Sequence, residues 1–201
     1  EYTGYQEGGL KNWYTDYPAM DNHVVAMLNR VTNIRVAPVK VKPGDPRLFE
    51  YPLLYIVEPE QMMLTDVEVA QLREYIRRGG ILFLDDFHGD EDSQPVTEIL
   101  NRILPGERIV DLPMEHELFH VFYDIPKLEQ VVNDGLVLCR TCDQWENGES
   151  GKEPQVRAML GKDGNIAVLM AFNNDLGDGL EWIDHPDYPV PMSVFATKFL
   201  S

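Results

Sequence analysis

The sequence has few cysteines, few basic residues and no long hydrophobic run, and each shortage excludes a class of protein. Only two of the 201 residues are cysteine, so the chain cannot build a zinc site from two cysteine pairs. No apolar stretch reaches the roughly 18 residues of a membrane-spanning helix. The longest, residues 166–172, has the length of a buried strand. The chain also lacks a glycine-rich phosphate loop and a Gly-x-Ser-x-Gly nucleophile elbow.

Basic side chains are scarce relative to acidic ones. The chain has 17 Lys and Arg residues against 34 Asp and Glu residues, which gives a formal charge of −17 at pH 7. Such a field repels phosphate backbones and anionic lipid head groups, so we expect no nucleic-acid partner and no binding to membrane surfaces. An acidic surface favours solubility. It leaves an unknown small molecule or a protein, including a basic one, as the expected partner.

The two cysteines, Cys139 and Cys142, form a Cys-x-x-Cys motif. A redox-active motif of this kind normally opens a helix, whose N-terminus stabilises the thiolate. Here the preceding residues 135–138 (GLVL) are typical of a strand, which argues against redox chemistry. Two unreactive thiols and a local disulfide in an oxidising compartment both stay open.

Hydrophobic periodicity predicts strands that alternate with helices. Strands are expected over residues 34–41, 53–57, 81–84 and 108–112, with Pro38 placing the first at an edge or a bulge. Helices are expected after Tyr17-Pro18, after the capping box of Thr65 and Glu68, and around residues 96–103. Such an alternation implies βαβ units and a mostly parallel sheet.

The last third of the chain has a different pattern. Residues 155–160 and 166–172 flank Gly161 to Asn165 (GKDGN), which is typical of a β-hairpin turn. Residues 192–200 indicate a closing helix, and Asn147 to Lys152 is the segment expected to be most flexible. Length and pattern together predict a single α/β domain over residues 1–201.

Two carboxylates and a histidine follow the predicted strand at residues 81–84. Ligands of open α/β sheets bind beyond the carboxyl ends of the strands, so we expect Asp85, Asp86 and His88 to line a ligand-binding cleft. Adjacent residues on a strand point to opposite sides, so the two carboxylates need not share a site. Either one could bind metal, act as a general base or bind a hydroxyl group; the alternative is that one caps the next helix.

Residues 116–120 (HELFH) match the His-Glu-x-x-His pattern of zinc proteases. In those enzymes the two histidines lie one turn apart on a long helix, and the Glu is the general base. Here Pro113 and Pro126 leave room for only two or three turns, and no third ligand lies at a recognised spacing. We interpret the match as accidental but keep His116 and His120 as ligand-binding candidates.

A second acidic segment, residues 173–182 (NNDLGDGLEW), directly follows the predicted strand at 166–172. Its oxygen ligands could wrap a calcium ion, although the spacing is not that of a calcium-binding helix–loop–helix. The alternative is a turn in which Asp and Gly serve the backbone geometry. Asp175, Asp178, Glu181 and Trp182 are therefore ligand-binding candidates, and Trp182 beside acidic groups would also suit the face of a sugar.

Several short motifs occur in an order that resembles a known family. They are Asp16-Tyr17-Pro18, Leu48 to Tyr55 (LFEYPLLY), Leu72 to Tyr75 (LREY) with Gly79-Gly80, Asp85-Asp86, Leu112 to His116 (LPMEH), Phe119-His120 and Asn174 to Trp182 (NDLGDGLEW). Together they resemble, over nearly the whole chain, the bacterial family catalogued as domain of unknown function 4159.

The resemblance implies a fold and a location. The family is similar to the class I glutamine-amidotransferase-like branch of the flavodoxin-like fold, which implies a three-layer α/β structure with a mostly parallel sheet. Members commonly carry an export signal or a membrane anchor, which implies an extracytoplasmic location, periplasmic or secreted. No activity is established for the family.

The resemblance also bears on two catalytic motifs. The family usually has Asp-His-Pro-Ile-Phe-His, with Pro where this chain has Glu117, and Pro cannot act as a base. Related amidotransferases place a nucleophilic cysteine at the strand-end elbow, and some family members have Cys just after the paired Asp. This chain has Phe87 and His88 there, so the resemblance does not carry amidotransferase chemistry over to it.

Three functions fit these residues. The first is a non-catalytic ligand- or partner-binding module, which accounts for the lack of a visible nucleophile, base and oxyanion set. The second is a hydrolase, metal-assisted or not, acting on carbohydrate or peptide, with Asp86 or His116 as base and Asp175 or Asp178 binding metal or hydroxyls. The third is an assembly module that meets a basic partner. We expect the first, without a cofactor and without an assigned metal site.

Overall fold

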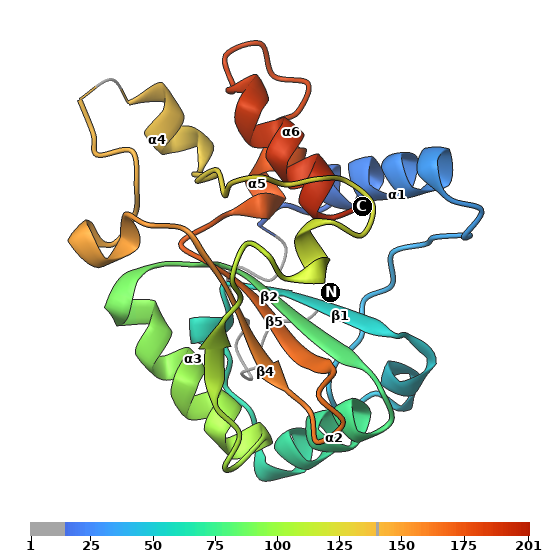
Figure 1. Ribbon diagram of the computed structural model, residues 1–201. Coiled ribbons are helices and arrows are strands. Elements are labelled where there is room, and N and C mark those ends of the chain that lie inside the picture. The colour runs from blue at the N-terminus through green and yellow to red at the C-terminus, as the bar shows by residue number, and fades with distance from the viewer. Residues whose placement is uncertain (1–14, 140) are drawn as a thin grey trace.

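The computed structural model describes residues 15–139 and 141–201 and contains a five-stranded open sheet with helices on both faces (Figure 1). The strands are β1 (Leu53–Val57), β2 (Ile81–Phe87), β3 (Ile109–Asp111), β4 (Gln155–Leu160) and β5 (Ile166–Phe172), in the order β1-β2-β5-β4-β3. β1, β2 and β5 pair in parallel, and β4 is antiparallel to both β5 and β3. Four strands therefore point the same way, which confirms the mostly parallel α/β sheet.

The described part of the chain forms six α-helices. They are α1 (Ala19–Val31), α2 (Asp66–Arg77), α3 (Gly89–Ile103), α4 (Asp134–Leu138), α5 (Leu176–Glu181) and α6 (Val190–Phe199). Helices α2 and α3 cover one face, whereas α1, α5 and α6 gather on the other (Figure 1). Over the described ranges, none of these helices has the length and apolar character required to cross a membrane.

Side chains of the central strands alternate between two hydrophobic clusters, one on each face. On β2, Leu82 and Leu84 are buried against α2 and α3, whereas Phe83 packs with α1, α5 and α6. On β5, Val168 belongs to the first cluster and Ala171 to the second. Successive strand residues point to opposite faces, so strands covered on both sides appear as continuous apolar runs in the sequence.

Local signals set several boundaries as expected. Thr65 accepts a hydrogen bond from the Glu68 N–H, and the Glu68 carboxylate accepts one from the Thr65 N–H at 2.9 Å, which completes the predicted capping box of α2. The chain leaves α2 through Gly79, whose φ of 95° lies in the left-handed region that favours glycine. Helix α1, strand β1 and strands β4 and β5 also lie where the periodicity predicts them.

Two local predictions are wrong. Residues 34–41 form no strand and lie outside the sheet, where Pro38 lacks the N–H that a ladder requires. Residues 135–138 belong to helix α4, because the Asn133 side chain caps this helix by accepting the Leu136 N–H at 3.0 Å. Short apolar runs do not distinguish a strand from one turn of helix, so the helix cap decides the conformation here.

Cys139 and Cys142 are joined by a disulfide immediately after α4. The pair therefore follows the C-terminus of a helix and does not open one. It lacks the N-terminal position at which a helix stabilises a reactive thiolate. This placement favours a structural bond over a redox-active motif.

Candidate functional site

The carboxyl ends of β2 and β5 meet at one edge of the sheet. The two strands are parallel neighbours, and the end of β2 also bonds to the residues that follow β5: the Asp86 N–H donates to the Asn174 carbonyl, and the Asn173 N–H donates to the Phe87 carbonyl, both at 3.0 Å. Two acidic segments that lie far apart in the sequence, residues 85–88 and 173–181, are thereby brought together. This edge is where open α/β sheets bind their ligands.

An irregularity in β2 separates the two adjacent aspartates. The register between β2 and β5 shifts between Leu84 and Phe87, and Asp86 has a φ of 57°, an unusual conformation for a residue other than glycine. Asp85 is fully buried, whereas the Asp86 side chain is 13% exposed. The predicted strand therefore runs on through both aspartates to Phe87, and its bulge gives them different surroundings.

Asp85 connects β1 and β2 to the start of α5. Its Oδ2 accepts hydrogen bonds from the Tyr55 hydroxyl and, at 3.0 Å, from the Gly177 N–H. Its Oδ1 is buried and has no hydrogen-bond partner within residues 15–139 and 141–201. Burial raises the pKa of Asp85 to about 7 even though both hydrogen bonds oppose the rise. Asp85 thus positions the backbone of α5 at the edge of the sheet.

Further carboxylates surround the start of α5. Asp16 lies before α1, Asp175 caps α5, and Asp178 and Glu181 lie within α5. Single oxygens of Asp16, Asp178 and Glu181 all lie within 4.8 Å of one another. Burial raises the pKa of Asp16 and of Asp175 well above the ordinary value of an aspartate. Repulsion from neighbouring carboxylates, of which Asp86 contributes most, raises both pKa values further. Burial likewise raises the pKa of Asp178 to about 7.

Asp16 is the least compensated of these carboxylates. It is only 5% exposed, and neither of its oxygens has a hydrogen-bond partner among the residues that the structure describes. By contrast, Asp175 accepts the Asp178 N–H at 2.9 Å, and Asp178 accepts the Asp134 N–H at 2.8 Å. A Cβ placed on Gly177 would lie 2.0 Å from Asp16 Oδ2, so the carboxylate packs directly against the backbone of α5. A buried carboxylate is costly without a partner that offsets its charge.

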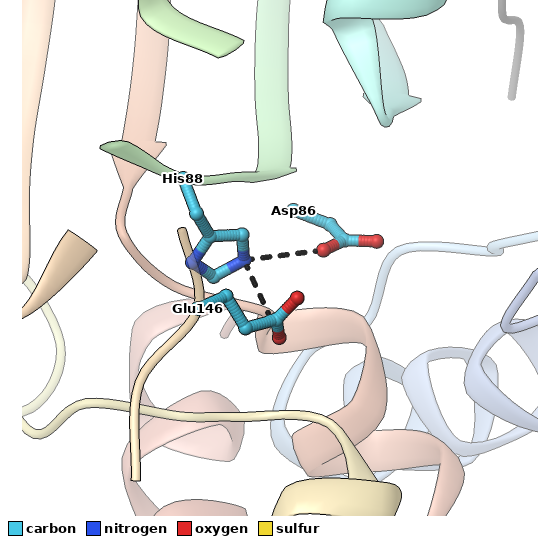
Figure 2. A group of neighbouring side chains, drawn as sticks. All are labelled: Asp86, His88 and Glu146. Carbon is cyan, nitrogen blue, oxygen red and sulfur yellow. Dashed lines mark hydrogen bonds and ion pairs between the residues drawn. The ribbon is translucent and has the colours of Figure 1, made fainter. Parts of the chain in front are cut away.

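A second group of side chains lies beside this cluster. Figure 2 shows Asp86, His88 and Glu146 pointing toward one another, with one ring nitrogen of His88 facing both carboxylates. His88 Nε2 is 3.3 Å from Asp86 Oδ1 and 3.8 Å from Glu146 Oε1. Burial alone would lower the pKa of His88, but the hydrogen bond to Asp86 and the charge of Glu146 outweigh burial and raise it.

A comparison with protein-family models decides the family of this chain. The model described as "Domain of unknown function (DUF4159)" matches residues 3–200. The chain belongs to the DUF4159 family. Comparison with curated proteins gives no match, and the family description states no activity. The function of this DUF4159 domain therefore has to be argued from its site.

Three candidates from the sequence, His116, His120 and Trp182, supply no ligand atom to either group. In the DUF4159 domain, His116 Nδ1 accepts the Leu118 N–H at 3.2 Å, and His120 contacts Asp124 Oδ1 at 2.6 Å. Both histidines flank a single 3₁₀ turn, Glu117–Phe119, which is not the long helix of a zinc protease. Trp182 follows α5, and the two groups able to hold a metal in the described part of the chain contain none of these three residues.

Two residues of the site, Asp16 and Glu146, were not predicted from the sequence. Asp16 lies in the Asp-Tyr-Pro motif before α1, and its place among the family motifs was the only signal for it. Glu146 lies in a loop between α4 and β4 and carries no local signal at all. Both reach the site through contacts that are distant in sequence, which periodicity and strand-end rules do not describe.

Proposed function

We propose that this DUF4159 domain is a non-catalytic binding module that holds a cation between Asp16, Asp178 and Glu181. The observation that carries the proposal is the buried Asp16 carboxylate, whose two unpartnered oxygens lie among other carboxylates. A cation would offset this charge and remove the mutual repulsion. An all-oxygen ligand set suits a hard divalent ion such as Ca²⁺, Mg²⁺ or Mn²⁺.

The test of this function is the Asp16→Asn variant. Metal-stripped wild-type protein is expected to bind at least one of Ca²⁺, Mg²⁺ and Mn²⁺ in calorimetric titration and to gain thermal stability from it. Asp16→Asn keeps the shape but removes the charge, so its affinity should fall about tenfold or more, a loss of about 1.4 kcal/mol or more. Asp187→Asn, which removes one exposed charge elsewhere, is the matched control. Equal binding by Asp16→Asn, or no wild-type binding at millimolar ion, would contradict the proposal.

A hydrolase is the second candidate, and one observation favours it. Burial raises the pKa of Asp85 and of Asp178 to about 7, where a carboxyl group can act as a general acid or base at neutral pH. Burial at a cation-binding site would raise the same two pKa values, so the binding module accounts for this observation as well. If the domain hydrolyses a glycoside or peptide substrate and Asp178→Asn abolishes this activity, the result would favour the hydrolase over the binding module.

We also propose a fold family and a location for the domain. The parallel strands β1, β2 and β5, covered by helices on both faces, support a three-layer flavodoxin-like fold of the amidotransferase-like type. The Cys139–Cys142 disulfide supports an extracytoplasmic location, periplasmic or secreted, because disulfides persist in oxidising compartments.

The disulfide gives a direct test. In protein exported to an oxidising compartment, Cys139 and Cys142 should resist alkylation until a reductant is added. Intact mass spectrometry should then show a gain of two alkyl groups after reduction and none before it. Alkylation of both cysteines without reductant would count against the extracytoplasmic proposal.

A further inference from the structure

We propose that Asp86, His88 and Glu146 form a separate site for a transition-metal ion of the zinc class. The site shares no residue with the Asp16 group. It does not depend on the cation-binding function proposed above. The two sites also differ in ligand chemistry, because this one includes an imidazole nitrogen and the other has only oxygens.

Two of the separations between ligand atoms are close to those expected around a bound ion. Zinc bonds of about 2.0–2.2 Å place tetrahedral ligand atoms about 3.3–3.6 Å apart. His88 Nε2 lies 3.3 Å from Asp86 Oδ1 and 3.8 Å from Glu146 Oε1. In a charge-assisted hydrogen bond, the distance between the nitrogen and the carboxylate oxygen is about 2.8 Å. Both contacts of His88 are longer than this. One carboxylate oxygen of Asp86 and one of Glu146 also lie within 4.8 Å of each other, so small movements would bring all three atoms onto one ion.

Surrounding contacts hold the three ligands in place. Asp86 is at the β2 bulge, and His88 is the residue that precedes α3. Glu146 Oε1 accepts a hydrogen bond from Asn133 Nδ2 at 2.6 Å, the kind of outer contact that orients metal ligands. Asn147 Nδ2 donates to the His88 carbonyl at 2.8 Å, which ties the loop of Glu146 to the start of α3. The set is therefore assembled before any ion binds.

The donor types select the class of metal. Imidazole and carboxylate together suit zinc and its neighbours, whereas calcium and magnesium prefer oxygen alone. The His88 side chain is only 3% exposed, but that of Glu146 is 25% exposed, so an ion can reach the site from solvent. Three protein ligands leave a fourth position open, which is typical of zinc sites that bind a further molecule.

Cobalt(II) tests the site, because its visible absorption reports the geometry of its ligands. Metal-stripped wild-type protein should develop tetrahedral cobalt bands at one equivalent, and zinc should abolish them. Glu146→Gln should weaken cobalt binding by more than about a hundredfold, which is the upper end of the range for an outer contact. Glu149→Gln, an exposed neighbour in the same loop, should bind as wild type does. Because Glu146 is partly exposed, its variant is expected to fold, and circular dichroism checks this.

Asp16→Asn separates the two proposals. This variant should still develop the cobalt bands. If the oxygen-only site binds no ion, the cobalt result is therefore unaffected, and if cobalt does not bind, the test of the oxygen-only site is unaffected. The alternative for this group is a protonated His88 paired with two carboxylates and no metal. Absence of cobalt bands at one equivalent, or bands that persist in both Glu146→Gln and His88→Gln, would overturn the proposal.

Discussion

Replacing Asp178 with Asn is expected to stabilise the cation-free domain at pH 8 and to abolish its cation binding. Asp178 is 7% exposed, and burial, followed by the charges of Asp86 and Glu181, raises its pKa to about 7. Asparagine removes the charge and still offers an oxygen to the Asp134 N–H. We expect a gain of about 1–3 kcal/mol in the free energy of unfolding, since each pKa unit corresponds to about 1.4 kcal/mol.

The pH dependence of this gain has a definite sign. In the unfolded chain Asp178 ionises near its ordinary pKa of about 4, whereas in the folded chain its pKa is about 7. Between these values the folded state binds more protons, so its stability falls as the pH rises through the window. Below about pH 4 the carboxyl is protonated in both states, and the wild-type protein and the variant should converge.

Urea denaturation at pH 5 and pH 8, in buffer that contains a chelator, measures the free energy of unfolding of the wild-type protein and of Asp178→Asn. The wild-type protein should lose more stability than Asp178→Asn between the two values. A saturating divalent ion should restore the wild-type protein at pH 8 and leave the variant unchanged, because only a state that binds the ion is stabilised by it. Equal slopes with pH in the two proteins would show that burial does not raise the pKa of Asp178 in the folded domain.

Sequence reasoning predicted the elements whose signals are local. Strands β1, β4 and β5 are short apolar runs with clear ends, and α2 carries its capping box in four consecutive residues. The prediction failed for residues 34–41, whose alternation is real but whose chain does not join the sheet. Alternation reports which side chains are apolar, whereas strand formation also requires a neighbour that accepts the hydrogen bonds.

The site was predictable in part for a topological reason. Residues that follow parallel strands meet at one edge, so Asp85, Asp86, Asp175 and Asp178 could be placed there from the strand pattern. Asp16 and Glu146 could not, because one precedes the first helix and the other lies in a loop between α4 and β4. Both candidate ion sites depend on these unpredicted members, and no strand-end rule would have completed either one.

Gly177→Ala is expected to destabilise the domain and to weaken its cation binding strongly. The added Cβ would lie 2.0 Å from Asp16 Oδ2 and 3.3 Å from the Tyr55 hydroxyl, so the Asp16 carboxylate must move. Helix propensity alone favours alanine over glycine by about 1 kcal/mol, so local effects would stabilise α5. A loss of about 1–3 kcal/mol, typical of overpacking, would therefore report the contact with Asp16.

A double-mutant cycle distinguishes this contact from a general disturbance of α5. Asp16→Ala removes the carboxylate that meets the new Cβ, so Gly177→Ala should cost much less in that background than in the wild-type protein. The coupling free energy should be about 1–3 kcal/mol, which lies within the range found for residues in direct contact. Chemical denaturation of the four proteins measures it. Additive effects would mean that Gly177 serves only the backbone of α5 and that the position of Asp16 does not depend on it.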